Sequence, residues 1–419
     1  MSRVTRLRWV VKYTASGPSP TCDDRILEAP HEWGVLKTTA IQWTGWREYE
    51  HKTLPEEFWG AKHLEVHAGD VLVTKAGPRH RVGVSAYVDR TRPKLIVSGK
   101  MLLLRVDTLS VDPRYLNWQL STPVPQAYLN ACKTGMAEAQ MNFANEDLLG
   151  MSVKVPPIEE QRRVADFLDL ETARIDRICS VQESVLTGIE ERDRAVRDIV
   201  VDELAARVGE LPLRRYALKI EQGASPPCLS FPRESNEWGV LKLSAVKAGR
   251  FLPSENKRLP EDIEPVRQYE LRDGDLLMSR ANTPELVGDV AVVEHAERRL
   301  LLPDLIYRVS LNREVRSDFA AQVLLSTRIR GLIQAVARGS SQSMVKLRGE
   351  DIRELPLPRA SSKEQSDLVF QVSEQMKFSS GLRSAVIRQL ALLAERRQAL
   401  ITAAVTGQID VTTARGASA

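Results

Sequence analysis

Residues 156–208 read PPIEEQRRVADFLDLETARIDRICSVQESVLTGIEERDRAVRDIVVDELAARV. After the opening Pro-Pro step the segment holds no further proline and is rich in residues that favour helices. Apolar residues at spacings of three, four and their sums form one stripe of a helix, namely Ile175, Ile178, Val185, Ile189, Val196, Ile199 and Leu204. The segment therefore predicts a short helix over 160–168 and a long amphipathic helix over 172–208, with Gly188 as its weakest point.

A second segment of the same design covers residues 358–407. It predicts helices over 363–376 and 382–405, interrupted at Phe378-Ser-Ser-Gly381 and stopped at Thr406-Gly407. Its stripe contains Leu382, Val386, Leu390, Leu393 and Leu400. Each stripe would be exposed on a lone helix, so we expect the two long helices to pack antiparallel as a coiled coil. The alternative is a pair of unrelated surface helices.

The whole chain repeats itself. Trp33-Gly-Val-Leu-Lys37 recurs as Trp238-Gly-Val-Leu-Lys242, an offset of 238 − 33 = 205. The same offset relates Gly69-Asp70 to Gly274-Asp275 and Val82-Gly83 to Val287-Gly288, whereas an offset of 204 relates Glu160-Gln161 to Glu364-Gln365 and Glu191-Arg192 to Glu395-Arg396. One short gap separates the two registers. The sequence is a tandem duplication, which predicts an internal pseudo-twofold repeat.

Each half begins with a globular region of mixed pattern. Short β-prone runs follow Gly-Asp turns at 70–74 and 275–279, and further strand regions are expected at 86–88, 290–293, 94–106 and 299–311. Helices are expected over 113–120 and 318–333. The predicted fold class is therefore α+β, with two α/β domains separated by a pair of long antiparallel helices. The predicted boundaries are a first domain over 1–155, a first helical spacer over 156–208, a second domain over 209–357, a second spacer over 358–410 and a tail over 411–419.

Composition narrows the class of protein. In 419 residues, Lys plus Arg exceed Asp plus Glu by 59 to 55, so any basic surface has to be local. No run of eighteen apolar residues exists and the first residues lack the apolar core of a signal peptide, so export and membrane spanning are not expected. Cys22, Cys132, Cys179 and Cys228 form no Cys-x-x-Cys pair, which favours reduced thiols in a cytosolic protein over disulfides or a zinc site.

Catalytic motifs are missing from the sequence. No Gly-rich loop ends in Gly-Lys-Ser/Thr, so no ATP site of the P-loop type is expected. Asp112-Pro-Arg-Tyr115 is similar to the catalytic motif of adenine methyltransferases, but Arg114 breaks that motif and a helix start is the better interpretation. Asp70 and Lys75 lack the acidic pair that a nuclease metal site needs. We therefore predict no catalytic and no metal-binding residues.

The helical segments resemble a known family, the specificity subunit of type I restriction-modification systems. In the first repeat the resemblance rests on Pro156-Pro157, Glu160-Gln161, Thr172, Ile175-Asp176 and Glu191-Arg192, and in the second on Pro356, Pro358, Glu364-Gln365 and residues 395–410, ERRQALITAAVTGQID. The first repeat lacks the Ala-Val-Thr-Gly stop, and the second lacks the Thr-x-x-Ile-Asp start. The order domain, helix, domain, helix is that of the family.

The resemblance implies a non-catalytic DNA-recognition subunit. Each globular region would be a target recognition domain that reads one half of a split double-stranded target, and the paired helices would set the gap. The helices would dock two methyltransferase (modification) subunits, and a restriction/translocase subunit would join them. The chain itself would bind no cofactor, because S-adenosylmethionine, ATP and Mg would be used by the other subunits. The resemblance also implies a cytoplasmic, bacterial or archaeal location without a membrane. A stand-alone DNA methyltransferase or nuclease, or a coiled-coil scaffold without DNA binding, are the alternatives.

Polar loops at equivalent places in the two repeats are the candidates for DNA contact. Arg pairs with guanine, Asn or Gln pairs with adenine, and Lys holds phosphate. The candidates are Lys75, Arg79, His80, Arg81, Arg92, Lys94, Lys133, Gln140 and Asn142 in the first repeat and Arg280, Asn282, Thr283, Arg338, Gln342, Lys346 and Arg348 in the second. For any one of them a solvated surface position is the alternative. Trp33 and Trp238 repeat identically, so we expect them to pack in the core.

Overall fold

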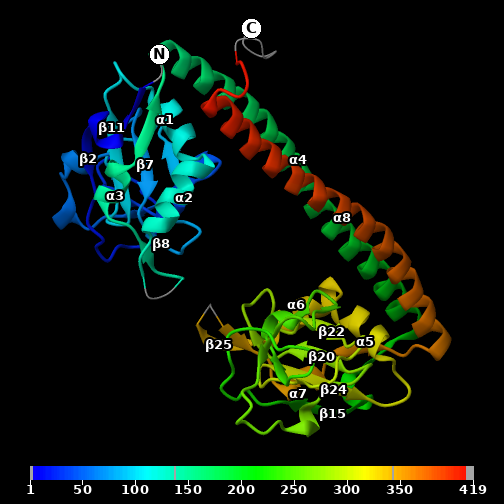
Figure 1. Cartoon of the computed structure of the whole chain (residues 1–419). Helices are drawn as coiled ribbons and strands as arrows, with labels where there is room; N and C mark the ends of the chain where they lie inside the picture. Colours follow the sequence, from blue (N-terminus) through cyan, green and yellow to red (C-terminus); the bar gives the residue numbers. More distant parts are fainter. Residues whose placement is uncertain (1–2, 136–137, 342–343, 412–419) are drawn as a thin grey trace. The chain divides into compact units, whose positions relative to one another are not determined.

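The computed structural model describes residues 3–135, 138–341 and 344–411 (Figure 1). The chain forms two compact units, Met1–Glu183 with Ile387–Ala419, and Ser184–Val386. Each unit contains one globular domain and a part of both long helices. Within the described ranges, no helix is long and apolar enough to cross a membrane.

The first domain is built on a four-stranded antiparallel sheet with buried strands at its centre. Its order is β2 (Val11–Ala15), β11 (Met101–Val106), β7 (Val71–Thr74) and β9 (Ser85–Tyr87). Alternate side chains of a strand point to opposite faces. Val71 and Val73 accordingly join one hydrophobic core, together with residues of the helices, while Leu72 joins a second core. The sheet is covered on both faces, which explains the unbroken apolar run of β7.

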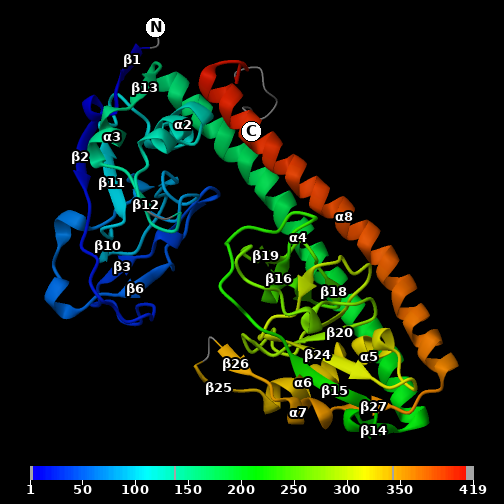
Figure 2. The ribbon, with the colours of Figure 1, turned by 60° about the horizontal axis from the view of Figure 1, so that its bottom comes forward.

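Three helices and a smaller sheet provide these two covers. One face is covered by α1 (Pro113–Leu120), α2 (Pro123–Cys132) and α3 (Asn145–Gly150). The other is covered by a three-stranded sheet (Figure 2) with the order β10 (Leu95–Ile96), β3 (Gly34–Leu36) and β6 (His51–Thr53). Antiparallel pairs complete the domain, namely β1 (Arg3–Arg6) with β13 (Ser152–Val155), β8 (Ala76–Gly77) with β12 (Met141–Asn142), and β4 (Ile41–Gln42) with β5 (Gly45–Trp46). As expected, Trp33 lies buried in the second core, whereas its repeat equivalent Trp238 is only half-buried, against a small cluster of the second domain.

The second domain repeats this topology. Its main sheet has the order β15 (Ala217–Gln222), β24 (Ile306–Leu311), β20 (Leu276–Ser279) and β22 (Val290–Val292), and its smaller sheet the order β19 (Asn256–Arg258), β16 (Gly239–Leu241) and β23 (Leu300–Leu301). The remaining strands are β14 (Glu210–Pro212) with β27 (Pro356–Pro358), β17 (Val246–Lys247) with β18 (Arg250–Phe251), and β21 (Ala281–Asn282) with β26 (Met344–Lys346) and β25 (Arg338–Ser341). The helices are α5 (Ser317–Leu324), α6 (Thr327–Val336) and α7 (Gly349–Arg353).

The structure confirms the internal repeat and locates its gap. Strand β24 begins 306 − 101 = 205 residues after β11, whereas α5 begins 317 − 113 = 204 residues after α1. The one-residue difference therefore lies in the loop between the sheet and the first helix. The single helical region expected over 318–333 is two helices, α5 and α6, which correspond to α1 and α2.

Both long helices are continuous, so the predicted interruptions are wrong. Helix α4 spans Ile158–Val208 and α8 spans Ser362–Thr406. Thr172, expected to start a helix, instead lies inside one, where its hydroxyl donates to the carbonyl of Leu168. Ser379, in the expected interruption, is buried and its hydroxyl donates to Asp193 of α4. Tertiary contacts have overridden weak local propensity.

The two long helices pair antiparallel within each unit (Figure 1). In the first unit, Arg397 of α8 donates to Asp176 of α4 at 3.2 Å. In the second unit, Asp193 contacts Arg383 of α8, and Arg207 contacts Glu364 at 2.7 Å. The residue number on α8 falls as the number on α4 rises, which is the antiparallel arrangement that the sequence predicts.

The predicted apolar stripes are only partly right. Ile175, Ile189, Leu204 and Val386 are buried, and Val196, Leu390, Leu393 and Leu400 are half-buried. Four predicted packing residues are instead exposed, namely Ile178, Val185, Ile199 and Leu382. The contact surface between two paired helices is narrow. Between Ile175 and Ile189 of α4, the half-buried residues on this surface are Cys179, Gln182 and Leu186. Neighbouring apolar residues therefore fall outside it.

A buried glutamine fixes each long helix to its own domain. The side chain of Gln161 accepts from the backbone N–H of Asp112 at 2.9 Å and donates to the carbonyls of Ser110 and Pro156. Gln365 makes the same three bonds in the second unit, to Arg316, Glu314 and Ala360. Because a buried amide that keeps all these partners is rigidly held, the repeated Glu-Gln pair of the sequence marks a structural joint.

Candidate nucleic-acid interface

In each domain a small antiparallel pairing joins two polar segments that are far apart in the sequence. In the first domain β8, which follows β7, pairs with β12. In the second domain β21, which follows β20, pairs with β26 at the equivalent place. We call each of these surfaces a platform: residues 75–81 with 133–135 and 138–142, and residues 280–283 with 338–341 and 344–348. The platforms unite most of the residues expected to contact DNA.

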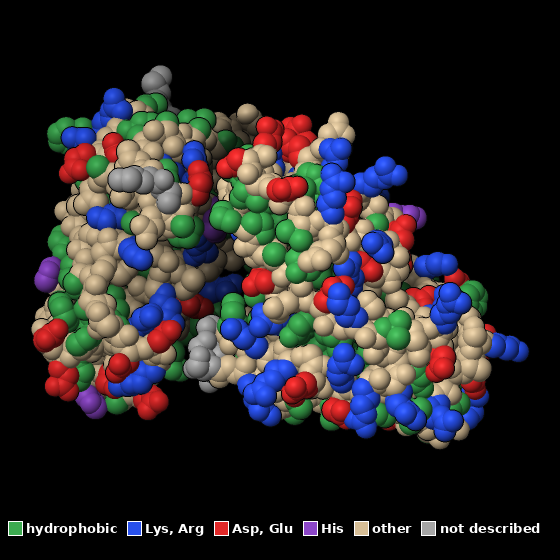
Figure 3. Space-filling model, turned by 90° about the horizontal axis from the view of Figure 1, so that it is seen from below, with side chains coloured by type: hydrophobic (Ala, Val, Ile, Leu, Met, Phe, Trp, Pro, Cys, Tyr) green, Lys and Arg blue, Asp and Glu red, His purple; other side chains and the backbone are tan. Residues whose placement is uncertain are grey.

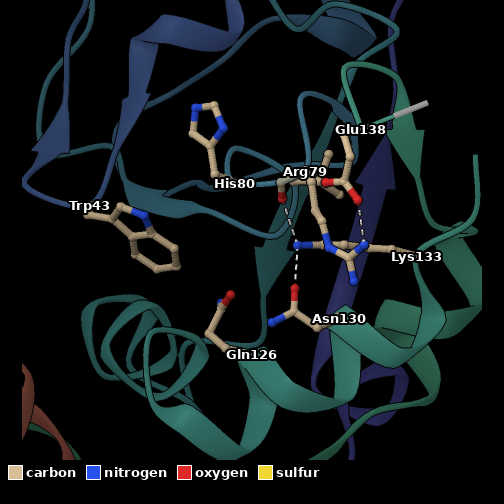
Figure 4. Close-up of a pocket in the computed structure, with 8 residues that line it drawn as sticks. Trp43, Arg79, His80, Gln126, Asn130, Lys133 and Glu138 are labelled. Atoms are coloured by element: carbon tan, nitrogen blue, oxygen red, sulfur yellow. Dashed lines mark hydrogen bonds and ion pairs between the residues drawn. The ribbon is translucent and has the colours of Figure 1, made fainter. Parts of the chain in front are cut away.

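The first platform is held together by contacts between its two segments. The backbone N–H of Arg79 donates to the carbonyl of Glu138 at 2.9 Å, and the two side chains form an ion pair, also at 2.9 Å. Lys133 donates from Nζ to the carbonyl of Arg79 at 2.9 Å and to the side chain of Asn130 (Figure 4). Burial, and then the charge of Arg79, lower the pKa of Lys133. The segment that carries Arg79 and the segment that carries Glu138 are therefore held together at the position of the ion pair.

A pocket of about 380 Å³ adjoins this ion pair (Figure 4). Trp43 and His80 line it, and 42% of Trp43 is exposed. Gln126 of α2 also lines it and donates to the carbonyls of Gly83 and Leu120. The site combines hydrogen-bond donors, acceptors and an aromatic face, which are the groups that contact nucleic-acid bases.

Three of the predicted cations are engaged in holding loops. Arg81 donates to the side chain of Gln42 and to two backbone carbonyls, those of Thr38 and Ile41. Arg92 donates to the carbonyl of Ala29, and Lys94 donates to those of Pro30 and His31. The structure therefore places Arg92 and Lys94 beside the loop before β3, and not on the platform.

Lys94 has a counterpart that explains it. It adopts a positive φ of 67°, and Arg299, at an offset of 205, adopts 68°. The backbone N–H of each donates to a glutamate, Glu65 or Glu270. A left-handed conformation is costly for these side chains, so its repetition indicates a shared turn that the fold requires.

Contacts of the remaining first-platform residues are local. Lys75 donates to Asn145 at 3.2 Å, and the side chain of Asn142 accepts from Thr134. Gln140 is exposed. These residues keep polar atoms at the surface of the β8–β12 pair.

The second platform presents cations on a hairpin. Arg338 of β25 and Lys346 of β26 are exposed neighbours, and Arg348 follows them. Arg280 lies over the ring of Tyr307 and donates to the carbonyl of Asp304. Asn282 accepts from the backbone N–H of Thr283, and Gln342 lies outside the described residues. Figure 3 shows Lys and Arg side chains interspersed with Asp and Glu on the face of the molecule that it presents.

Other candidates for chemistry have structural roles. The side chain of Asp112 caps α1 by accepting from the backbone N–H groups of Arg114 and Tyr115, which confirms the helix start. Asp70 pairs with Arg105 at 2.9 Å. Over the described part of the chain, no group of three or more His, Cys, Asp and Glu residues is arranged to hold a metal ion.

Comparison with known proteins gives a consistent result, although no protein-family model matches the chain. The type I restriction enzyme EcoEI specificity subunit of Escherichia coli is 36% identical over 197 residues, 47% of this chain and 32% of that protein. The EcoKI specificity subunit of Escherichia coli strain K12 is 24% identical over 300 residues, 67% of this chain and 63% of that protein. This chain resembles type I restriction specificity subunits. The alignments span less than two thirds of either relative.

A solved structure extends the likeness to the fold. One solved structure, described as the structural basis of complex assembly and conformational transition of the type I restriction-modification system, matches this chain with a TM-score of 0.60. The match covers 97% of this chain and 98% of that chain at 16% identity. The two-domain, two-helix architecture is thus shared with a protein of that system.

Several residues that line the pocket of the first domain were not predicted from the sequence. They are Trp43, Gln126, Asn130 and Glu138. A signal for them existed in the repeat, because their equivalents in the second domain are Ala248, Arg330, Gln334 and Gln342. Positions that differ between repeats inside a shared topology are where the two domains can differ in recognition.

Proposed function

We propose that the chain is the DNA sequence-specificity subunit of a type I restriction-modification complex, and that each platform contacts one half of a split double-stranded target. The observation that carries this proposal is the pair of platforms, which occupy the same place in two copies of one fold but have different side chains. One shared fold with two sets of polar side chains suits two different half-sites. The names of the two curated relatives support the same assignment.

The helix pair is the proposed seat for two methyltransferase subunits. Ile178 of α4 and Leu382 of α8 occupy equivalent positions, 382 − 178 = 204 residues apart, and each is 44% exposed. An exposed apolar residue at the same place in each repeat suits two copies of one partner. The restriction/translocase subunit would join this assembly. The chemistry, with S-adenosylmethionine, ATP and Mg, would belong to these partners, so the chain would act as a non-enzymatic, cofactor-free component of the cytoplasm.

The helices are also the proposed determinant of the gap between half-sites. Helix α4 has 51 residues, so at 1.5 Å per residue it is about 76 Å long. Because this continuous helix connects the domains, its length limits the separation of the half-sites. One turn of DNA is about 34–36 Å, so a gap within a few turns is expected.

The deciding experiment maps methylated adenines in the genome of cells that express the chain with its partner subunits. We expect a split motif, two short specific blocks separated by unspecified bases. A continuous motif, or no methylation, would contradict the proposal. Incubating the purified chain alone with DNA and S-adenosylmethionine, or with Mg, tests the alternative of a stand-alone methyltransferase or nuclease; we expect no product. DNA that fails to bind the assembled complex would favour a scaffold.

A further inference from the structure

The ion pair of Arg79 and Glu138 is unusually well positioned for a surface pair. Surface ion pairs ordinarily add little stability because water screens them and their long side chains must be ordered. Here the backbones of both residues are joined by a hydrogen bond, and Lys133 holds the carbonyl of Arg79. The two charged groups are therefore placed side by side before any ligand arrives, which reduces the entropic cost of using them in binding.

Both side chains keep free hydrogen-bonding atoms. The side chains are 51% and 75% exposed, and the bond joins Nη1 of Arg79 to Oε1 of Glu138. Among the described residues, neither Nε and Nη2 of Arg79 nor Oε2 of Glu138 makes a further bond. The pair thus presents donors directly beside an acceptor.

That order of groups matches one kind of base pair. In the major groove, guanine presents two acceptors, N7 and O6, and its partner cytosine presents the N4 donor. Arginine donates to the guanine atoms while a carboxylate accepts from cytosine N4. An A·T pair presents a donor at adenine N6 and an acceptor at thymine O4, so it would set donor against donor and acceptor against acceptor.

We propose that Arg79 and Glu138 together read one G·C base pair in the half-site that the first domain contacts. This inference rests on the proposed function and adds a base identity to it. The equivalent positions in the second domain are Pro284 and Gln342, which cannot form such a pair. The reading of this base pair is therefore assigned to the first domain alone.

The test compares methylation motifs of complexes assembled with the unmodified chain and with Arg79→Ala, Glu138→Ala or Arg214→Ala. For Arg79→Ala we expect one G·C position of one half-site to lose roughly ten- to a hundredfold of its preference, the scale of a bidentate contact. Glu138→Ala removes only the acceptor for cytosine N4, so the same position should lose a smaller part of its preference, because the Arg79 donors still oppose the N6 donor of adenine. The other half-site and the gap should not change.

Arg214→Ala is the matched control, because Arg214 forms an ion pair with Glu354 at similar exposure, outside both platforms. We expect it to leave the motif unchanged. Thermal unfolding and complex assembly of all three variants should equal those of the unmodified chain, since the substituted residues are exposed.

The outcomes separate the two proposals. A continuous motif or no mark from the unmodified complex would remove the proposed function. Two outcomes would overturn only the inference. In the first, the motif is split but neither Arg79→Ala nor Glu138→Ala changes it. In the second, Arg79→Ala weakens methylation equally at every position, as the loss of a phosphate contact would. The inference would also be overturned if the half of the motif that Arg79→Ala changes contained no G·C pair.

Discussion

The two domains share one topology but differ on their platforms. Gln161 and Gln365 make the same three hydrogen bonds, and Lys94 and Arg299 share a left-handed turn. On the platforms, by contrast, the Arg79–Glu138 ion pair has no equivalent in the second domain. Residues that the fold needs are repeated, whereas residues that contact DNA under the proposed function are free to differ. A comparison of the two repeats of this one chain therefore distinguishes the residues that maintain the fold from the candidates for DNA contact.

The largest effect is expected from exchanging one domain. Replacing residues 1–155 with the matching segment of a specificity subunit that has another target should replace one half of the methylation motif completely and leave the other half intact. The reason is that each platform belongs to a single domain. Exchanging residues 209–357 is the reciprocal control and should change only the other half. Methylated-adenine mapping measures both, and a change in both halves after a single exchange would refute separate reading.

A matched lengthening of the helices should change the gap alone. Inserting seven residues beside Gly188 of α4, and seven beside Ala385 of α8, adds about 10.5 Å while keeping the contact period. At 3.4 Å per base pair, the gap should grow by about three base pairs. Insertion into α4 alone is the control, because it shifts the Asp193–Arg383 contact and should impair assembly. An unchanged gap after the matched insertion would mean that the helices do not set it.

The glutamine joints should be equivalent and independent. Gln161→Leu leaves the backbone N–H of Asp112 and two carbonyls without partners in a buried place, which should destabilise the first unit by about 3 kcal/mol. Gln365→Leu should do the same to the second unit. Native-state hydrogen exchange distinguishes the units, because it reports local opening. Loss of protection in both units from either substitution would show that they do not open separately.

Much of the fold was predictable because its signals are local. Apolar spacing identified both long helices, Gly-Asp turns located β7 and β20, and the repeat predicted two equivalent domains. The interruption expected at residues 378–381 was wrong: Ser379 in this stretch is helical and bonds Asp193, a partner on another helix. Propensity alone contains no such information.

The site was predictable in outline only. Its loops stood out by their charge, but the pairing of β8 with β12 connects segments more than sixty residues apart, as Gly77 with Met141 illustrates. The role of Arg81 was hidden because it bonds backbone carbonyls, which no side-chain pattern reveals. The repetition of Lys94 as Arg299 was a visible sign of a structural role.

The smallest effect concerns how each unit fastens its part of the helix pair. Arg397 of α8 and Asp193 of α4 are equivalent in the repeat, 397 − 193 = 204 residues apart. In the first unit Arg397 bonds Asp176 of α4, whereas in the second unit Asp193 accepts from Ser379 of α8. Ser379→Ala removes this buried bond and should destabilise the second unit by about 1 kcal/mol. Ser380→Ala is the matched control: Ser380 is exposed, and alanine favours helices, so stability should hold or rise slightly. Hydrogen exchange of the α8 amides near residue 379 measures the difference, and equal effects of the two substitutions would show that the Asp193 contact does not keep α8 continuous.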